Sequence, residues 1–220
     1  MLILSKIERY KDKRRYDIYI DGEQVLRIHE EVLITYGLRT GDILSDEILD
    51  NIRSSEEFVQ AKEKAIAILS RRMRSEKELW DKLRIKEFHP EIINKVIIHL
   101  RDRGFLDDTR YAMTYTNHIL SRKPAGKALL QRELRLKGIS QVITKDTINK
   151  RLTDGDEDEL ALTAAQQFLK RHQSMNNKND DKARKQKLCS FLARRGFSWQ
   201  TIYRVLRLLD TESLIEENIQ

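Results

Sequence analysis

Apolar and polar residues alternate along the first 30 positions, which is typical of β-strands with one buried face. The apolar positions of this stretch are Ile3, Ile7, Tyr16, Ile18, Ile20, Val25, Leu26 and Ile28. Asp21-Gly22 separates the second strand from the returning one and is the residue pair favoured in a tight type I′ turn. A short helix over Glu30–Tyr36 should follow and end at Gly37, with Gly41 in the next turn. The sequence therefore predicts a small N-terminal β-hairpin module over residues 1–45.

From Asp46 onward the apolar spacing is helical, and one pattern occurs three times. All four apolar positions match without a gap in Leu79-x3-Leu83-x4-Phe88-x8-Ile97, Leu130-x3-Leu134-x4-Ile139-x8-Ile148 and Leu188-x3-Leu192-x4-Phe197-x8-Leu206. The copies lie 51 and then 58 residues apart, and we expect the polar stretch Gln173–Asp181 to form a longer loop in the third copy. Self-similarity at a nearly fixed spacing predicts a repeat architecture, with these positions in the core.

Residues that start and stop helices occupy matching places in the copies. Ser75 with Glu78 forms a capping sequence, and Pro90 and Ser198 should open later helices. Gly138 and Gly196 should end helices in the left-handed conformation, a place that Glu87 takes in the first copy. Pro124 should lie near the start of the middle helix of the second copy. Further helices are expected ahead of each copy, at Phe58–Leu69, Asp108–Leu120 and Leu160–Arg171.

Each copy is therefore predicted to be a bundle of three helices, a unit too small to be stable without neighbours. The short joints Gly104–Asp108 and Thr153–Glu159 should bring neighbouring units close together. We expect a mainly α fold of three tandem three-helix repeats that form an elongated, curved array behind the β-hairpin module. The expected domains are 1–45, 46–107 (a linker helix and repeat one), 108–156 (repeat two) and 157–220 (repeat three with a C-terminal tail).

Composition agrees with an extended helical protein, since 35% of the 220 residues are charged and only two are proline. We see neither a signal peptide nor an apolar run long enough to cross a bilayer, so we expect a cytoplasmic protein without a membrane contact. The one cysteine, Cys189, excludes an internal disulfide framework and a cysteine-rich zinc site. We also expect a monomer.

The positive charge lies mostly after the N-terminal module. Residues 1–57 hold 9 basic and 13 acidic side chains, a net of −4, whereas residues 58–220 hold 33 basic and 22 acidic ones, a net of +11. The predicted middle helix of every repeat is basic, and Lys86, Lys137 and Arg195 share one repeat position. The candidate partner-binding or DNA-binding residues are Arg71, Arg72, Arg74, Lys82, Lys86, Arg122, Lys123, Lys127, Arg132, Arg135, Lys137, Lys182, Arg184, Lys185, Arg194 and Arg195.

One exposed run of charge is usually only a solvated helix face, but three aligned runs favour binding to a polyanion or an acidic protein. No zinc-finger spacing or basic zipper is present, so binding to nucleic acid should tolerate any sequence. Trp80 and Trp199 have the chemistry to stack on bases, yet partial burial beside the core is the simpler expectation. Tyr111 and Tyr115 should pack between repeats one and two.

Catalysis has little support in the sequence. The five histidines share no metal-ligand spacing, no phosphate-binding or nucleophile motif is present, and we expect no metal and no cofactor. Cys189 follows core Leu188 and is expected to be a small buried hydrophobe, not a nucleophile. The acidic run Asp154–Glu159 should place negative charge at a helix N-terminus, because it lacks the spacing of a calcium loop.

Three segments of the chain resemble the RecX family of recombinase regulators. They are Arg74-Ser-Glu-Lys-Glu-Leu79, Leu83–Phe88 and Gly104-Phe-Leu-Asp-Asp-Thr-Arg-Tyr-Ala112. The resemblance extends over roughly Phe58 to Leu209, about two thirds of the chain, and includes the three repeats. Asp108, the second residue of the Asp-Asp pair in this last segment, is expected to cap the following helix. The chain departs from the compact family pattern in its N-terminal module and in the longer loop of repeat three.

The resemblance implies three tandem three-helix units that bind along the groove of the RecA–DNA filament. It implies inhibition of strand exchange, ATP hydrolysis and co-protease activity, with roles in DNA repair, recombination and the SOS response. It also implies binding to single- and double-stranded DNA. The residues alone leave two alternatives open: a sequence-tolerant DNA-binding module with no recombinase contact, and an enzyme that uses Cys189 or scattered carboxylates.

Overall fold

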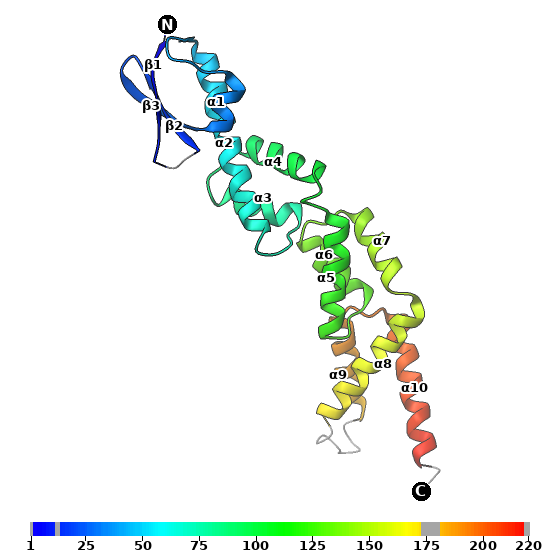
Figure 1. The fold of residues 1–220 in the computed structure, drawn as a ribbon. Coiled ribbons are helices and arrows are strands. Elements are labelled where there is room, and N and C mark those ends of the chain that lie inside the picture. The colour runs from blue at the N-terminus through cyan, green and yellow to red at the C-terminus, as the bar shows by residue number, and fades with distance from the viewer. Residues whose placement is uncertain (1, 12–13, 173–180, 218–220) are drawn as a thin grey trace. The chain divides into compact units, whose positions relative to one another are not determined.

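A computed structural model describes residues 2–11, 14–172 and 181–217 of the protein. The chain divides into two compact units, Met1–Leu106 and Asp107–Gln220, and each is described by itself. The first unit contains the strands and helices α1 to α4, and the second contains helices α5 to α10 (Figure 1). The predicted mainly α fold with a small strand module at its N-terminus is confirmed.

The N-terminal module is an antiparallel sheet of four strands in the order β3-β2-β1-β4. Its strands are β1 (Leu2–Arg9), β2 (Arg15–Ile20), β3 (Glu23–His29) and β4 (Ile43–Leu44). Asp21 and Gly22 join β2 to β3 with φ of 51° and 89°, so the predicted tight turn is confirmed. The hairpin prediction was incomplete, because β1 and the two-residue β4 extend the hairpin to a larger sheet.

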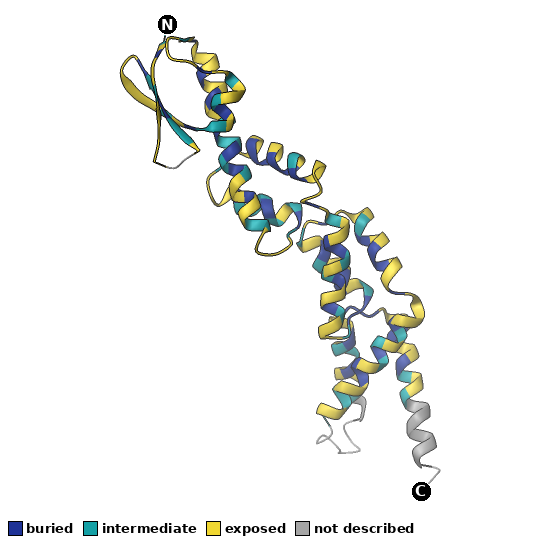
Figure 2. Ribbon diagram, in the orientation of Figure 1, coloured by how far each residue is buried: buried dark blue, intermediate teal, exposed yellow. Residues whose placement is uncertain are grey.

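Two helices complete the core of this module. Helix α1 (Glu30–Tyr36) ends at Gly37 with φ of 60°, as predicted. Helix α2 (Asp46–Leu69) is a single helix of 24 residues. Its first half places Leu49 and Ile52 in the core of the module, and its second half places Ala61 and Ala65 in the core of repeat one (Figure 2). The predicted linker helix and the predicted helix Phe58–Leu69 are thus one element, since no proline or glycine interrupts them.

The three repeats have the predicted three-helix composition. Repeat one comprises the second half of α2, α3 (Glu76–Arg84) and α4 (Pro90–Asp102). Repeat two comprises α5 (Asp108–Arg122), α6 (Lys127–Leu136) and α7 (Gln141–Arg151), and repeat three comprises α8 (Asp154–Arg171), α9 (Asp181–Arg194) and α10 (Trp199–Glu217). The two repeated leucines are buried in every copy, as Leu79, Leu83, Leu130, Leu134, Leu188 and Leu192. The repeat predicted from apolar spacing is therefore confirmed at its core.

The turn after each middle helix has the same backbone conformation in all three repeats. Glu87, Gly138 and Gly196 have φ of 68°, 79° and 82°, in the left-handed region. Pro90 is the first residue of α4, and the Ser198 hydroxyl accepts a hydrogen bond from the Thr201 N–H at 3.1 Å. The helix boundaries predicted from these residues are confirmed, including the unusual positive φ at a glutamate.

Two predicted boundaries were wrong by a few residues. Asp107, not Asp108, caps α5, because its Oδ1 accepts from the Arg110 N–H at 2.9 Å. The predicted joint Thr153–Glu159 is helical from Asp154, since Thr153 and Asp156 form a reciprocal capping box. The acidic run therefore lies at a helix N-terminus, as expected, and the Thr153 backbone hydrogen bond lowers the pKa of Asp156. Most of the predicted loop Gln173–Asp181 falls outside the described residues.

Candidate functional site

The predicted basic residues occupy loops and helix ends as well as middle helices. On the middle helices lie Lys82, Lys127, Arg132, Arg135, Lys182, Arg184, Lys185 and Arg194. The remaining ones lie elsewhere: before α3, at the end of α5 and in the turns after α3, α6 and α9, as Arg71, Arg72, Arg74, Arg122, Lys123, Lys86, Lys137 and Arg195. The prediction that the charge belongs to the middle helices is therefore wrong for half of the set. The side chain of Lys182 lies outside the described residues.

The repeat position shared by Lys86, Lys137 and Arg195 does not present three equivalent free cations. Lys86 is exposed, but Lys137 lies 5.4 Å from the centre of the Tyr115 ring. The Arg195 Nη1 donates to the Pro124 carbonyl at 3.2 Å. Lys137 and Arg195 thus contribute to packing within the second unit, and replacing them would disturb the fold as well as the surface.

Other predicted cations are paired within the protein. The Lys127 Nζ lies 2.5 Å from Asp154 and 3.9 Å from Glu157, so it links α6 to α8. The hydrogen bond from Lys127 lowers the pKa of the Asp154 carboxyl. Arg72 lies 3.8 Å from Glu78, and Arg74 and Arg184 are half-buried. These side chains are less available to a partner than the sequence suggested.

Six of the predicted side chains are exposed and make no hydrogen bond or ion pair with the rest of the described chain. They are Arg71, Lys86, Arg122, Lys123, Arg135 and Arg194. Every repeat contributes at least one of them. A solvated cation without an internal partner is the kind of group that contacts phosphate or an acidic protein surface.

One basic side chain of this set lines a groove between α6 and α7 in repeat two. The groove has a volume of about 710 Å³ and is lined by Ala128, Gln131, Arg132, Arg135, Ile139, Gln141, Thr144 and Lys145. Three lining residues are cationic and none is acidic. Gln131, Gln141, Thr144 and Lys145 were not among the predicted site residues, although a comparison of the repeats places Ile93 and Ile202 at the positions equivalent to Thr144.

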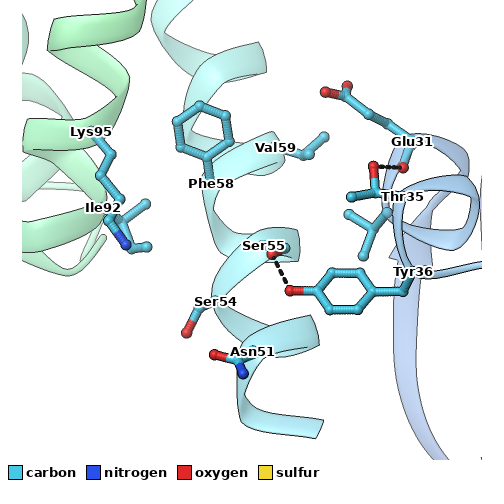
Figure 3. Close-up of a pocket in the computed structure, with 11 residues that line it drawn as sticks. Glu31, Thr35, Tyr36, Asn51, Ser54, Ser55, Phe58, Val59, Ile92 and Lys95 are labelled. Carbon is cyan, nitrogen blue, oxygen red and sulfur yellow. Dashed lines mark hydrogen bonds between the residues drawn. The ribbon is translucent and has the colours of Figure 1, made fainter. Parts of the chain in front are cut away.

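A second groove, between α1, α2 and α4 of the first unit, has a different character (Figure 3). Its volume is about 400 Å³, and its charged lining residues are Glu31 and Lys95, which balance. The hydroxyls of Tyr36 and Ser55 bond to each other at 2.9 Å, and Thr35 donates to the Glu31 carbonyl at 2.7 Å. The hydroxyls of Thr35, Tyr36 and Ser55 are therefore used in hydrogen bonds within the protein.

The two tryptophans differ in how far they are buried. Trp80 is half-buried and its Nε1 donates to Asn94 at 3.1 Å, which confirms the expected partial burial. Trp199 was expected to be partly buried but is 59% exposed beside Tyr203, which is 61% exposed. Trp199 is the first residue of α10, and its ring centre lies 6.2 Å from that of Tyr203. Tyr111 and Tyr115 stack on each other within repeat two, with ring centres 5.8 Å apart.

The residues considered for catalysis or metal binding are Cys189, the histidines and the carboxylates. Cys189 is half-buried against the core of repeat three. Across residues 2–11, 14–172 and 181–217, histidine, cysteine and carboxylate side chains form no cluster that would hold a metal ion. The described helices include none with the length and apolarity to cross a membrane.

Comparison with known proteins gives consistent matches along the whole chain. Three family models match in order: the first three-helix domain of RecX over residues 61–100, the second over 107–147 and the third over 156–206. The chain is 32% identical to regulatory protein RecX of Clostridium acetobutylicum, over 96% of this chain and 97% of that protein. It is 33% identical to regulatory protein RecX of Clostridioides difficile, over 95% and 96% of the two chains.

Solved structures give the same result. A crystal structure of regulatory protein RecX has a TM-score of 0.77 and 27% identity, and covers 94% of this chain and 100% of that one. The crystal structure of RecX from Lactobacillus salivarius has a TM-score of 0.62 and 26% identity, and covers 71% of this chain and 99% of that one. The first of these matches extends beyond the three repeats, whereas the second leaves out more than a quarter of this chain.

Proposed function

Because the chain belongs to the RecX family of regulatory proteins, we propose that it binds the RecA–DNA filament and restrains the recombinase, ATPase and co-protease activities of that filament. In this role it acts by binding alone. The partner follows from the family, whereas the mode of contact follows from the surface of the repeats.

The observation that supports this proposal best is the free positive charge on each of three homologous repeats. Lys86 in repeat one, Arg122 in repeat two and Arg194 in repeat three are exposed and lack an internal partner in the described chain. A filament offers the same acidic or phosphate-bearing surface at regular intervals. Several weak contacts on one chain then act together, because the first contact raises the effective concentration for the next.

A second candidate function is sequence-tolerant DNA binding without a recombinase contact. The groove between α6 and α7 supports it, because three cations and no acid line that groove. The two functions share a strong dependence on salt, since both involve release of counterions from phosphate. Salt dependence alone therefore does not separate them.

The two functions differ in how much protein is needed to stop the filament. We expect the chain to inhibit RecA-dependent ATP hydrolysis on single-stranded DNA at protein levels far below those that would cover the DNA. The measurement is a titration of ATPase rate at fixed DNA and RecA. Inhibition that begins only when the protein suffices to coat all of the DNA would refute the filament function and favour plain DNA binding.

A further inference from the structure

The groove between α6 and α7 differs in chemistry from the corresponding surfaces of the other repeats, and we propose that it binds phosphodiester groups of a nucleic acid backbone. Arg132 and Arg135 line it from α6, and Lys145 lines it from α7. Arg135 and Lys145 are exposed and free of ion pairs in the described chain, and Arg132 has only Glu133 at 3.8 Å. Cations on both walls therefore face a space with no acidic lining residue.

A buried hydroxyl in the same groove lacks a partner. Thr144 is only 6% exposed, and its Oγ1 makes no hydrogen bond within the described chain. Buried polar atoms are nearly always hydrogen-bonded, so this hydroxyl keeps a hydrogen-bonding capacity that the described chain does not use. A phosphate oxygen would accept this O–H together with the neighbouring guanidinium donors.

The start of α7 adds to the positive potential of the groove. Gln141, the first residue of α7, lines the groove, and the first turn of this helix contains no acidic residue. The Ser140 hydroxyl accepts the Ile143 N–H at 3.3 Å, which leaves the preceding N–H groups of that turn without a side-chain cap. Backbone N–H groups at a helix start favour an anion.

Comparison of the repeats shows that these residues are not required by the fold. In repeat one the positions of Gln131, Thr144 and Lys145 hold Trp80, Ile93 and Asn94, by the offset of 51 residues. The Trp80 Nε1 donates to the Asn94 side chain across this place at 3.1 Å. In repeat three the same positions hold Cys189, Ile202 and Tyr203. The three-helix unit thus accepts apolar residues here, and the polar set of repeat two has a reason other than packing.

A nucleic acid fits this groove better than an acidic protein segment does. Protein interfaces place large apolar or aromatic anchors at their centre, but Ala128 and Ile139 are the two apolar residues that line this groove. Interfaces with nucleic acid are more polar and strongly positive. Glutamine amides beside guanidinium groups suit a chain of phosphates and sugars. This groove proposal rests on the proposed function in one respect. In the filament, the nucleic acid backbone that the groove contacts would be that of the bound DNA.

The test is the affinity of the full chain for fluorescent single- and double-stranded oligonucleotides, without recombinase, by anisotropy at two salt concentrations. Arg135→Ala should weaken binding about tenfold and reduce the slope of log affinity against log salt by about one. Thr144→Val should weaken binding about fivefold, as expected for a hydrogen bond to a charged group. Arg135→Ala keeps the fold, because repeat three has Ala193 at the equivalent position.

Each variant has a matched control. Arg84 is the counterpart of Arg135 in repeat one and is exposed, so Arg84→Ala should bind within about twofold of the wild type. Thr147 on α7 is also buried with an unpartnered Oγ1 but does not line the groove, so Thr147→Val should leave affinity unchanged.

The outcomes separate the groove from the wider function. Wild-type affinity in both groove variants, or equal losses in the controls, would overturn the groove proposal. Groove variants that keep DNA affinity but lose ATPase inhibition would also overturn it, and would indicate an acidic protein surface as the ligand. In that case the filament function stands. If the wild type itself fails to inhibit the ATPase, the filament function is wrong, and the groove proposal is still decided by the DNA affinities.

Discussion

Replacing Gly196 with alanine is expected to lower the free energy of unfolding of the second unit by about 3 kcal/mol or more, the scale of a severe core substitution. Gly196 has φ of 82°, a conformation that alanine adopts only with strain. A Cβ at this position would also lie 2.1 Å from the Leu129 backbone nitrogen and 2.5 Å from its Cβ. Leu129 is part of α6, so the clash falls between repeats two and three.

The reason for this close approach is that repeat three caps a helix of repeat two. The Gly126 N–H donates to the Arg195 carbonyl at 2.9 Å, and the Ala128 N–H donates to the Gly196 carbonyl at 3.1 Å. The Lys127 N–H donates to the Glu157 carboxylate at 3.1 Å. Gly126 has no side chain to cap α6. The first N–H groups of a helix lack an acceptor within the helix, and here the acceptors come from repeat three. Moving the Gly196 backbone away from Leu129 would break the two bonds to the Arg195 and Gly196 carbonyls.

The measurement is denaturant unfolding followed by tryptophan fluorescence, because Trp80 lies in the first unit and Trp199 in the second. The control is Gly104→Ala, because Gly104 has φ of 73° but no atom within 4 Å of an added Cβ. That variant should lose only about 1 kcal/mol, from backbone strain alone. Equal losses in the two variants would contradict the interlocking of repeats two and three.

A triple charge reversal, Lys86→Glu with Arg122→Glu and Arg194→Glu, is expected to raise the protein concentration needed for half-inhibition of the RecA ATPase by more than about tenfold, as for several lost phosphate or acidic contacts. One exposed, unpaired cation is reversed in each repeat. None of the three lines the groove between α6 and α7. Stability should change little, since none of these side chains is buried or paired.

The control has the same change in net charge on the first unit: Arg39→Glu with Lys64→Glu and Lys95→Glu. These three side chains are exposed and unpaired in the described chain but lie outside the predicted basic set. The control should inhibit within about threefold of the wild type, the size of a long-range charge effect. If both triple variants lost inhibition equally, net charge and not the chosen surface would be responsible.

The core of the repeats could be predicted because it depends on local rules. Leucine spacing fixes which positions are buried, and residues such as Ser75, Pro90 and Gly138 fix where helices start and stop. The sheet was only half predicted, since β4 is a strand of two residues, Ile43 and Leu44, that pairs with β1 from far along the chain. A strand of two residues is too short to show the alternation of apolar and polar residues from which a strand is predicted.

The candidate site was harder to predict, because exposure depends on packing between repeats. The sequence shows that Lys127 and Arg195 are basic, but not that one pairs with α8 and the other donates to a carbonyl of the preceding repeat. The groove was missed for the opposite reason. Thr144 is an ordinary helix residue in sequence, and only the structure shows that it is buried in the wall of a groove beside three cations.

The most direct test of a filament regulator is its preference between two forms of the same DNA. Binding of the labelled chain should be measured to single-stranded DNA alone and to that DNA fully covered by RecA with a non-hydrolysed nucleotide. We expect the filament to be bound at least about tenfold more tightly than the bare strand, because contacts from several repeats act together. Equal affinity for the two, or tighter binding to bare DNA, would contradict the role of the chain as a filament regulator.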